Sequence, residues 1–429
     1  MSLMKRRAFL EAAGVGLGLT ILPAWARGAS PSDQVVMGAV GTGGRGTNVM
    51  KWFAGLPDVR MAAVADVDAQ HCARSAQYLR SRPESRDAKG YRDFRKMLER
   101  KDIDAVCCGT PDHWHALVTI LSFQAGKDVY CEKPLAHNYR EARAMLTTGR
   151  RYARVFQLGT QIHSGENYHR VVELVRSGEI GTVHTVRVWK AGGTGVMRWT
   201  PPPPCPPHLD YDLWLGPAPW RPYHPMHVHR SFRRFLDFST GTYADFWCHI
   251  SDIAFWALEL TAPTNVVVRG ELQTEGMADA PKWVELDLDF PTVKYHWTSK
   301  RPKGVPGRVG GGIGCCFEGE KGKLVTDYGS RAIYLDGQVL RDLPHVPKTL
   351  PRSPGHHLDF LRAVRTRRPT ESNLSYVVPM TTPMFFGRIA LLLGRDTLRW
   401  DQQAERFVGD DEATRLLGRV MREPWTLPV

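Results

Sequence analysis

A glycine-rich segment near the start of the chain limits the possible fold more than any other feature. Residues 36–46 read Val-Met-Gly-Ala-Val-Gly-Thr-Gly-Gly-Arg-Gly, a small apolar strand that runs into G-x-G-x-x-G at Gly41, Gly43 and Gly46. Such glycines form a tight turn and let the backbone approach a pyrophosphate, which then lies at the positive end of the next helix. The segment therefore predicts the phosphate-binding turn of a dinucleotide-binding fold.

An acidic residue at the right distance supports this interpretation. A second apolar strand, residues 61–65, ends at Asp66, twenty residues after Gly46. An acid at this spacing binds the ribose hydroxyls of NAD and disfavours the 2′-phosphate of NADP. We expect NAD, with NADP left open because Arg45 and Arg74 are near in sequence. The predicted cofactor contacts of the turn are Gly41, Thr42, Gly43, Gly44, Arg45 and Gly46.

Alternating strands and helices between residues 34 and 158 predict βαβ units and a parallel sheet. Ligands of such sheets bind at the carboxyl ends of the strands. We expect strands at 34–40, 61–66, 105–108, 128–131 and 155–158, and helices at 45–55, 68–80, 91–100, 114–125 and 138–152.

Period-two alternation dominates after residue 158 and is typical of a sheet with one solvated face. The predicted fold is an α/β Rossmann domain at 31–158 and an α+β domain with an open, mainly antiparallel sheet at 159–429. An apolar face of that sheet (Val267, Val284, Leu286) predicts a homodimer or homotetramer, because large exposed apolar patches are unusual on monomers. We expect strands at 183–190, 265–272, 283–290, 293–298, 314–318 and 323–327, and helices at 166–177, 356–368 and 379–393.

The first thirty residues have the order of an export signal. Lys5-Arg6-Arg7 precedes an apolar stretch at 12–22, and Ala24-Trp25-Ala26 provides a small-x-small cleavage site. We therefore predict a twin-arginine signal peptide at 1–30, the twin-arginine machinery as a partner of the precursor, and a periplasmic or otherwise exported enzyme. The apolar stretch is too short for a stable membrane span, and we expect none elsewhere.

The formal net charge of +13 does not by itself indicate nucleic-acid binding. The arginines are scattered and form no long basic run, which is typical of a solvated surface. We expect a small molecule as partner and no nucleic acid.

Lys133 is the first candidate catalytic residue. It follows the apolar strand at 128–131 in the sequence Glu132-Lys133-Pro134, at the end of the sheet where ligands bind. A lysine there is placed to hydrogen-bond a substrate hydroxyl, with Glu132 expected to hold it. Pro134 fixes the turn and removes a competing donor.

The second candidate group lies on a predicted helix at 241–252. Asp245, His249 and Asp252 are spaced i, i+4 and i+7 and share one face. An acid one turn from a histidine can orient the imidazole and raise its basicity, which suits proton transfer with a sugar hydroxyl. The apolar residues expected to pack on the other side are Phe246, Ile250 and Ile253.

Four histidines, with H-x-x-H-x-H at 224–229, form another conspicuous group. They could ligate a metal, but no carboxylate is close in sequence, so we expect no metal and interpret them as substrate-contacting or surface residues. Aromatic side chains suit sugar stacking, and we predict that Trp189 and Tyr243 contact substrate with Lys133, Asp245 and His249. The histidines are His208, His224, His227 and His229.

Together these motifs resemble the Gfo/Idh/MocA family of glucose–fructose oxidoreductase and myo-inositol dehydrogenase, in its exported bacterial branch. The resemblance extends through Gly159-Thr-Gln161, 214–220, 318–322 and 394–400, and so covers nearly the whole mature chain. It implies a Lys133, Asp245 and His249 catalytic set. It also implies that the following residues contact the cofactor: Asp66, Thr110, Pro111, His115, Glu132, Lys133 and Gln161.

One position departs from the family pattern Asp-x-Gly-x-His, because Trp247 stands where glycine is usual. An indole there could crowd or stack on the nicotinamide. Three functions therefore stay open. The first is an NAD(P)-dependent oxidoreductase acting on a CH–OH carbon of a sugar, sugar derivative or cyclitol, with a tightly bound cofactor. The second is an NAD-dependent glycosidase acting by transient oxidation, and the third is a non-catalytic sugar- or nucleotide-binding protein.

Overall fold

The computed structural model describes residues 34–428, so the predicted signal peptide lies outside the described residues. The chain first forms a six-stranded sheet in the order β3-β2-β1-β4-β5-β6, and every neighbouring pair in it is parallel. This confirms the predicted Rossmann-type sheet. The strands are β1 (Val35–Val40), β2 (Val59–Ala65), β3 (Lys89–Tyr91), β4 (Ala105–Cys108), β5 (Asp128–Cys131) and β6 (Phe156–Leu158).

Both faces of this sheet are covered, which explains why its strands are apolar without alternation. Val106 and Cys108 belong to one hydrophobic cluster, whereas their neighbours Ala105 and Cys107 belong to another. The strand order reverses between β1 and β4, and this places the glycine turn beside the loop after β4. The helices are α2 (Gly44–Ala54), α3 (Ala69–Arg80), α4 (Phe94–Leu98), α5 (Asp112–Gln124) and α6 (Tyr139–Arg151).

The helix expected at 91–100 is shorter than predicted. Residues 89–91 pair with β2 as strand β3, and α4 begins only at Phe94. Asp93 has extended backbone, and its side chain accepts a hydrogen bond from the Arg95 amide. An aspartate in that position caps a helix, so the helix starts after it.

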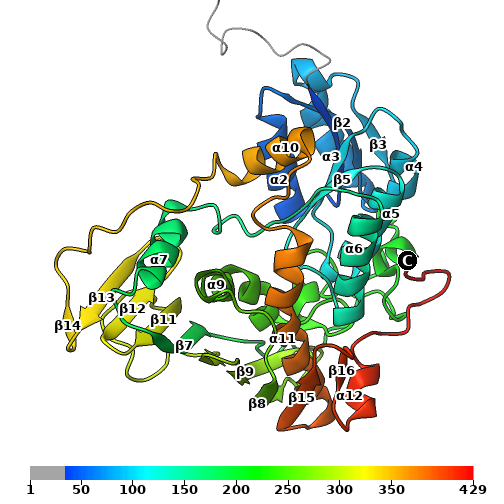
Figure 1. Ribbon diagram of the computed structural model, residues 1–429. Helices are drawn as coiled ribbons and strands as arrows, with labels where there is room; N and C mark the ends of the chain where they lie inside the picture. Colours follow the sequence, from blue (N-terminus) through cyan, green and yellow to red (C-terminus); the bar gives the residue numbers. More distant parts are fainter. Residues whose placement is uncertain (1–33, 429) are drawn as a thin grey trace, which may run out of the picture. The chain divides into compact units, whose positions relative to one another are not determined.

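The rest of the chain contains a ten-stranded sheet in the order β14-β13-β12-β11-β7-β10-β9-β8-β15-β16 (Figure 1). Among its described pairs only β7 and β10 are parallel, which confirms a mainly antiparallel sheet. The strands are β7 (Val183–Lys190), β8 (Asn265–Leu272), β9 (Pro281–Asp289), β10 (Lys294–Thr298), β11 (Ile313–Gly319), β12 (Gly322–Thr326), β13 (Arg331–Leu335), β14 (Gln338–Val339), β15 (Thr397–Asp401) and β16 (Arg406–Phe407). The helices are α7 (Glu166–Arg176), α8 (Tyr211–Leu215), α9 (Thr242–Leu258), α10 (His356–Thr366), α11 (Leu374–Leu393) and α12 (Asp411–Arg415), with a 3-10 turn, η4, at Ser231–Arg234.

The apolar face predicted for this sheet is not exposed. Val284 and Leu286 are fully buried, and α11 packs so closely that a Cβ added to Gly387 would lie 2.8 Å from the Leu286 side chain. Val267 points to the opposite face, where Arg269 and Asp287 form a 2.6 Å ion pair. The three residues therefore do not form one exposed apolar patch. This patch no longer supports the predicted homo-oligomer, which stays a prediction.

Helix α10 packs against the parallel sheet, although it follows most of the second sheet in sequence. It lies beside α2 in Figure 1. The Phe360 ring is 5.8 Å from the Phe53 ring, within the cluster that covers β1 and β2. The C-terminal segment also returns to the parallel sheet, where the Trp425 ring lies 4.8 Å from that of Trp114 on α5.

Among the described helices, α11 alone is long and apolar enough to cross a membrane by length and composition. Most of it is buried inside the protein, and it contains Pro379 and Pro383. It packs between α6, α9 and β8, so its apolar surface is covered by the chain itself.

Candidate active site

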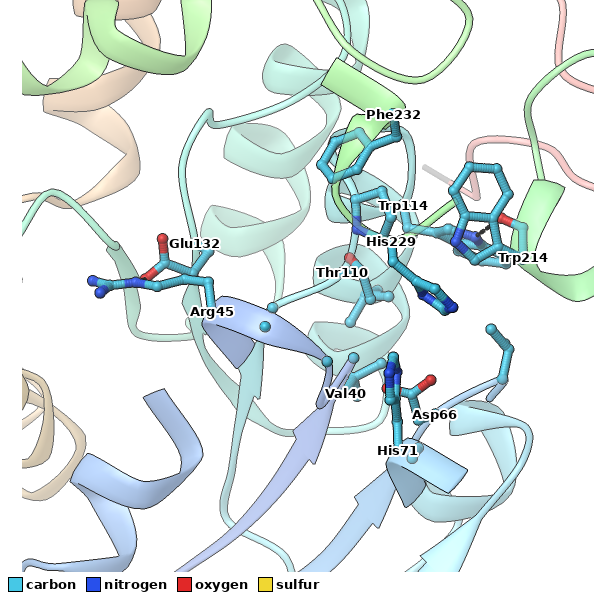
Figure 2. Close-up of a pocket in the computed structure, with 18 of the residues that line it drawn as sticks. Val40, Arg45, Asp66, His71, Thr110, Trp114, Glu132, Trp214, His229 and Phe232 are labelled. Carbon is cyan, nitrogen blue, oxygen red and sulfur yellow. Dashed lines mark hydrogen bonds and ion pairs between the residues drawn. The ribbon is translucent and has the colours of Figure 1, made fainter. Parts of the chain in front are cut away.

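A cavity of about 650 Å³ follows the carboxyl ends of β1, β2, β4 and β5 (Figure 2). Side chains from α8 and from the segment around η4 also line it: Leu213, Trp214, His229, Arg230, Phe232 and Arg233. It therefore lies where parallel sheets bind their ligands. The following residues predicted to contact a cofactor line it: Gly41, Gly43, Gly44, Arg45, Asp66, Thr110, Pro111, Glu132 and Lys133.

The glycine turn has the close approaches that require glycine. Gly41 has a φ of 74°, and a Cβ added to Gly46 would lie 1.8 Å from the Gly41 carbonyl oxygen. The turn and the start of α2 are thus in direct contact, which leaves the helix N-terminus open to the cavity. This geometry suits a pyrophosphate.

Asp66 lies at one end of the cavity and holds the turn in place. Its Oδ2 accepts a 2.7 Å hydrogen bond from the Thr42 amide, and its Oδ1 accepts one of 2.9 Å from the Asp68 amide. The His71 ring lies beside it, with Nδ1 3.8 Å from Asp66 Oδ2. The Asp66 interaction raises the pKa of His71 against the opposing effect of burial.

Arg45 and Glu132 face each other on the opposite side of the cavity (Figure 2). Arg45 Nε donates a 3.0 Å hydrogen bond to Glu132 Oε1, and its guanidinium lies 4.5 Å from the Trp52 ring centroid. Glu132 was expected to hold Lys133. It binds Arg45 instead, so this expectation is corrected.

Lys133 is held by Asp245 on α9. Its Nζ donates to Asp245 Oδ1 at 2.6 Å and to the Asp245 carbonyl oxygen at 3.0 Å. Arg233 Nε donates to the same Oδ1 at 2.9 Å. Burial alone raises the pKa of Asp245, but the Lys133 and Arg233 charges outweigh it and hold this pKa at about 2. The buried carboxylate therefore fixes two cations that line the cavity.

His249 lies one turn after Asp245 on α9 and is buried. Burial, followed by the Lys133 charge, lowers its pKa to about 3, so the imidazole is neutral at ordinary pH. Its Nδ1 has no hydrogen-bond partner. Asp245 was expected to orient this ring, but its carboxylate binds Lys133 and Arg233. The expectation that Asp245 orients the ring and raises its basicity is therefore corrected, because burial and the Lys133 charge outweigh the effect of Asp245 on the His249 pKa.

Asp252, the third residue of the helix pattern, has a structural position. Its carboxylate lies 2.9 Å from His163 Nδ1 and accepts a 2.6 Å hydrogen bond from the Tyr376 hydroxyl. The His163 ring stacks on Trp256 at 4.0 Å. Asp252 thus joins α9 to neighbouring segments outside the cavity.

Four of the predicted cofactor residues do not line the cavity. Thr42 is buried with its amide on Asp66, and Gly46 packs on Gly41. His115 joins two loops, because its Nδ1 lies 2.6 Å from the Pro134 carbonyl oxygen and its Nε2 2.9 Å from that of Thr110. Gln161 has a buried Oε1 without a hydrogen-bond partner.

The two aromatic residues predicted to contact substrate lie in the protein core. Trp189 is fully buried on β7, and its Nε1 donates to the Gly310 carbonyl oxygen at 2.7 Å. Tyr243 is buried with its hydroxyl on the Met384 carbonyl oxygen of α11. Neither residue lines the cavity, so the expectation that they contact substrate is corrected. The alternation of residues along β7 does not indicate which face of the strand is buried.

Trp247 does not crowd the cavity. It is fully buried, its Nε1 donates to the Met380 carbonyl oxygen at 2.8 Å, and its ring lies 5.1 Å from that of Trp297. The indole therefore packs between α9, α11 and the sheet. Phe246, expected to pack down, is only half-buried, with Lys190 Nζ 4.6 Å from its ring centroid.

Sequence reasoning missed the side chains that close the cavity from the second part of the chain. Arg233, Phe232 and Trp214 lie on short irregular elements without periodic patterning. The nearest signal was the pair Arg233–Arg234, a few residues before the Asp245 helix.

The fold and the cavity define a dinucleotide-binding protein with a second, sheet-containing part that completes the site. The family model for the oxidoreductase-family NAD-binding Rossmann fold matches residues 35–160. The model for the oxidoreductase-family C-terminal alpha/beta domain matches residues 167–427. The chain belongs to the Gfo/Idh/MocA oxidoreductase family.

Curated relatives match less than half of the chain. A glycosyl hydrolase family 109 protein of Shewanella pealeana is 28% identical over 200 residues, which are 42% of this chain and 44% of the relative. The uncharacterized oxidoreductase YrbE of Bacillus subtilis is 25% identical over 185 residues, 42% of this chain and 48% of the relative. The matches thus span less than half of these relatives.

Solved structures share the whole fold at low identity. The aldose-aldose oxidoreductase of Caulobacter crescentus, complexed with glycerol, has a TM-score of 0.62 at 18% identity and covers 85% of this chain and 99% of that one. The WlbA dehydrogenase of Bordetella pertussis, in complex with NADH and UDP-GlcNAcA, has a TM-score of 0.60 at 14% identity and covers 83% and 96%.

Proposed function

We propose that the protein is an NAD-dependent oxidoreductase that transfers a hydride between a hydroxyl-bearing carbon of a sugar, sugar derivative or cyclitol and the nicotinamide. The observation that carries the proposal is the pair of cations, Lys133 and Arg233, which Asp245 fixes in the lining of the same cavity as Asp66. A cavity that holds both an acid for ribose and a proton-handling group suits this chemistry.

The residues present fit a nicotinamide dinucleotide. Gly41–Gly46 and the start of α2 would hold the pyrophosphate, and Asp66 would bind the adenosine ribose. Gln161, which resemblance to the family assigns to the cofactor, does not line the cavity and gives no support to this fit. The carboxylate of Asp66 favours NAD over NADP. Retention of NAD through purification tests the proposed tight binding.

A bound nicotinamide supplies the hydride acceptor for this reaction. Lys133 is placed to donate a hydrogen bond to the substrate hydroxyl oxygen, because its ammonium group lines the cavity and is held from behind by Asp245. Its charge stabilises the negative charge that develops on that oxygen as the proton leaves. Asp245 stays ionised and keeps the ammonium in position.

His249 is the proposed acceptor of the hydroxyl proton. Its pKa of about 3 keeps it neutral, the form that accepts a proton, and its Nδ1 is unpartnered. The substrate then loses a proton from oxygen to His249 and a hydride from carbon, and its C–O bond becomes a carbonyl. Tyr328, whose ring lies 5.9 Å from that of His249, carries another buried hydroxyl without a partner, and neither residue lines the cavity of about 650 Å³.

A second candidate function is an NAD-dependent glycosidase that oxidises its substrate transiently. The glycosyl hydrolase family 109 relatives favour it. An oxidised carbon acidifies the neighbouring C–H, so that loss of this proton expels the glycosidic group; water then adds to the resulting C=C bond, and the hydride returns to the carbonyl carbon. The third candidate, a non-catalytic binding protein, drew its support from Trp247, and the burial of that indole in the core removes it.

A glycoside panel separates the two enzymatic functions. The dehydrogenase leaves an intact ketosugar together with reduced cofactor, whereas the glycosidase releases free sugar with no net change in cofactor. Detection of neither product, with sugar binding shown by calorimetry, would contradict both.

The proposal includes export by the twin-arginine route and assembly into a homodimer or homotetramer. Lys5-Arg6-Arg7 and Ala24-Trp25-Ala26 support the export signal. Loss of export on replacing both arginines by lysine, in the producing bacterium, tests it. Light scattering of the purified protein tests the assembly, and a monomeric mass would contradict it.

A further inference from the structure

Three histidines surround one carboxylate oxygen at the Asp66 end of the cavity. Asp68 Oδ2 lies 3.4 Å from Nε2 of His229, 3.7 Å from Nε2 of His208 and 4.0 Å from Nε2 of His71. Figure 2 shows His71 and His229 pointing toward each other beside Asp66. The centroids of these two rings are 4.7 Å apart, so the two imidazoles are in direct contact.

The carboxylate is positioned for a ligand. Asp68 is buried, and its Oδ1 caps α3 by accepting hydrogen bonds from the Gln70 and His71 amides at 2.8 and 3.2 Å. Its Oδ2 lies within 4.0 Å of an Nε2 atom of each of the three histidines. A carboxylate oxygen and imidazole nitrogens are ligands that zinc binds.

The backbone fixes the relative positions of these residues. The Ala69 amide donates to the His208 carbonyl oxygen at 2.8 Å, and the Asp210 amide donates to that of Val67 at 3.0 Å. The β2–α3 turn and residues 208–210 therefore form one rigid support. Such support is what a preorganised site requires.

We propose that Asp68, His71, His208 and His229 form a binding site for a zinc ion or a similar transition-metal ion. Ligand atoms of a tetrahedral zinc site lie about 3.3 Å apart, because zinc–nitrogen bonds are ~2.0–2.1 Å long. The ligand atoms of Asp68, His71 and His229 all lie within 4.8 Å of one another, so side-chain rotations that move each atom by about 1 Å would bring them to an ion.

Side chains that could orient two of the imidazoles lie nearby. Asp66 Oδ2 lies 3.8 Å from Nδ1 of His71, the carboxylate–histidine arrangement that supports many metal ligands. The Gln70 side-chain amide nitrogen lies 3.4 Å from Nδ1 of His208; with the amide turned by 180°, its Oε1 would accept the Nδ1 proton and leave Nε2 free for the metal. We expected no metal because no carboxylate is near the histidine motif in sequence, but Asp68 supplies one from the turn between β2 and α3.

The structure divides the histidine motif. His229 joins the proposed metal site, whereas Nε2 of His224 lies 2.9 Å from the Thr200 carbonyl oxygen and His227 Nδ1 lies 3.4 Å from the Tyr211 hydroxyl. The ion would link the β2–α3 turn to the segment that closes the cavity.

Calorimetric titration of zinc into the chelator-treated, untagged mature protein tests the proposal. We expect one equivalent bound by the wild type. Asp68→Asn keeps the helix cap but removes the anionic oxygen, and His229→Gln removes a partly exposed ligand; each should weaken zinc binding at least about tenfold. His184→Gln, an exposed histidine on the ten-stranded sheet, is the matched control and should bind as the wild type does. Melting temperatures without zinc identify folded variants.

Three results would overturn the proposal. The first is no stoichiometric zinc binding by the folded wild type. The second is unchanged binding by His229→Gln and Asp68→Asn, which would place the ion at the buried group Cys108, His115 and Cys131 instead. The third is stabilisation by inorganic phosphate but not by zinc, which would define the histidines as an anion site. If Asp68→Asn does not fold, His229→Gln and His71→Gln decide.

Discussion

Lys133 Nζ donates a 2.6 Å hydrogen bond to Asp245 Oδ1 and so joins the loop after β5 to helix α9 across 112 residues of sequence. Because Arg233 binds the same oxygen, one buried carboxylate positions two cations at the end of the cavity. The proposed chemistry depends on this arrangement more than on either cation alone.

Lys133→Ala should lower turnover at least about a hundredfold, the smaller contribution of a positioned proton-handling group. Asp245→Asn should have a similar effect, because the amide no longer holds an ammonium. Lys96→Ala is the matched control, since Lys96 is exposed on α4 and pairs only with Glu99. Steady-state kinetics with any active sugar measures the effect, and wild-type turnover in Lys133→Ala would contradict the assigned role.

Asp66→Ala should weaken NAD binding about ten- to a hundredfold, because it removes an acceptor for ribose and the hydrogen bond that holds the Thr42 amide. Asp87→Ala, an exposed acid paired with Arg60, should leave NAD binding unchanged. Titration calorimetry checks both. Preferential binding of NADP by the wild type would contradict the assignment.

The pH dependence of kcat/KM should have no acid limb near pH 6.5. A base must be unprotonated, and His249, whose pKa is lowered to about 3, is unprotonated from well below pH 5 upward. Rates measured between pH 5 and 8 for the wild type and His249→Gln test this. An acid limb centred near 6.5 that disappears in His249→Gln would mean that the ring titrates normally.

Stability should fall as the pH is lowered from 7 to 5. Burial lowers the pKa of His113 from 6.5 to about 3, so below pH 6.5 the unfolded chain binds a proton that the folded chain excludes. The contribution of neutral His113 to the free energy of unfolding is complete above pH 6.5 and decreases as the pH falls toward 3. At pH 5 it is smaller by about 2 kcal/mol. Urea unfolding at both pH values measures this. His113→Gln should show a smaller difference, and an unchanged difference would contradict the prediction.

Trp247→Ala should destabilise the protein by about 3–5 kcal/mol, the usual cost of removing a buried tryptophan. NAD affinity of the folded fraction should not change, because the indole lies between α9, α11 and the sheet. Denaturation and calorimetry distinguish the two effects. A changed NAD affinity without loss of stability would place the indole at the cofactor.

The sequence predicts the parallel sheet well because each strand and its turn carry local signals. The glycine turn follows β1 and Asp66 follows β2. These two strands are adjacent and parallel, so the turn and the acid lie close together. The predicted helix boundaries were wrong where a single capping residue sets them. Asp93 caps α4, so the helix begins at Phe94 and not at residue 91. The strands β13 to β16 are short and were not predicted from periodicity.

The site was harder to predict because its contacts join distant segments. The sequence suggested Glu132 as the partner of its neighbour Lys133. In the structure Glu132 binds Arg45, and Lys133 binds Asp245 instead. Trp189 was assigned to substrate from composition, which does not say which face of β7 is buried. The carboxylate of the histidine cluster, Asp68, follows a different strand altogether.

Hydride transfer is the central claim, and an isotope measurement tests it most directly. Wild-type protein loaded with NAD is mixed with a panel of carbon-deuterated sugars and cyclitols, and the cofactor is analysed by mass spectrometry during a single turnover. We predict that at least one sugar delivers one deuterium to the cofactor, and that Lys133→Ala slows this transfer about a hundredfold. Binding of sugars without any deuterium reaching the cofactor would contradict the account.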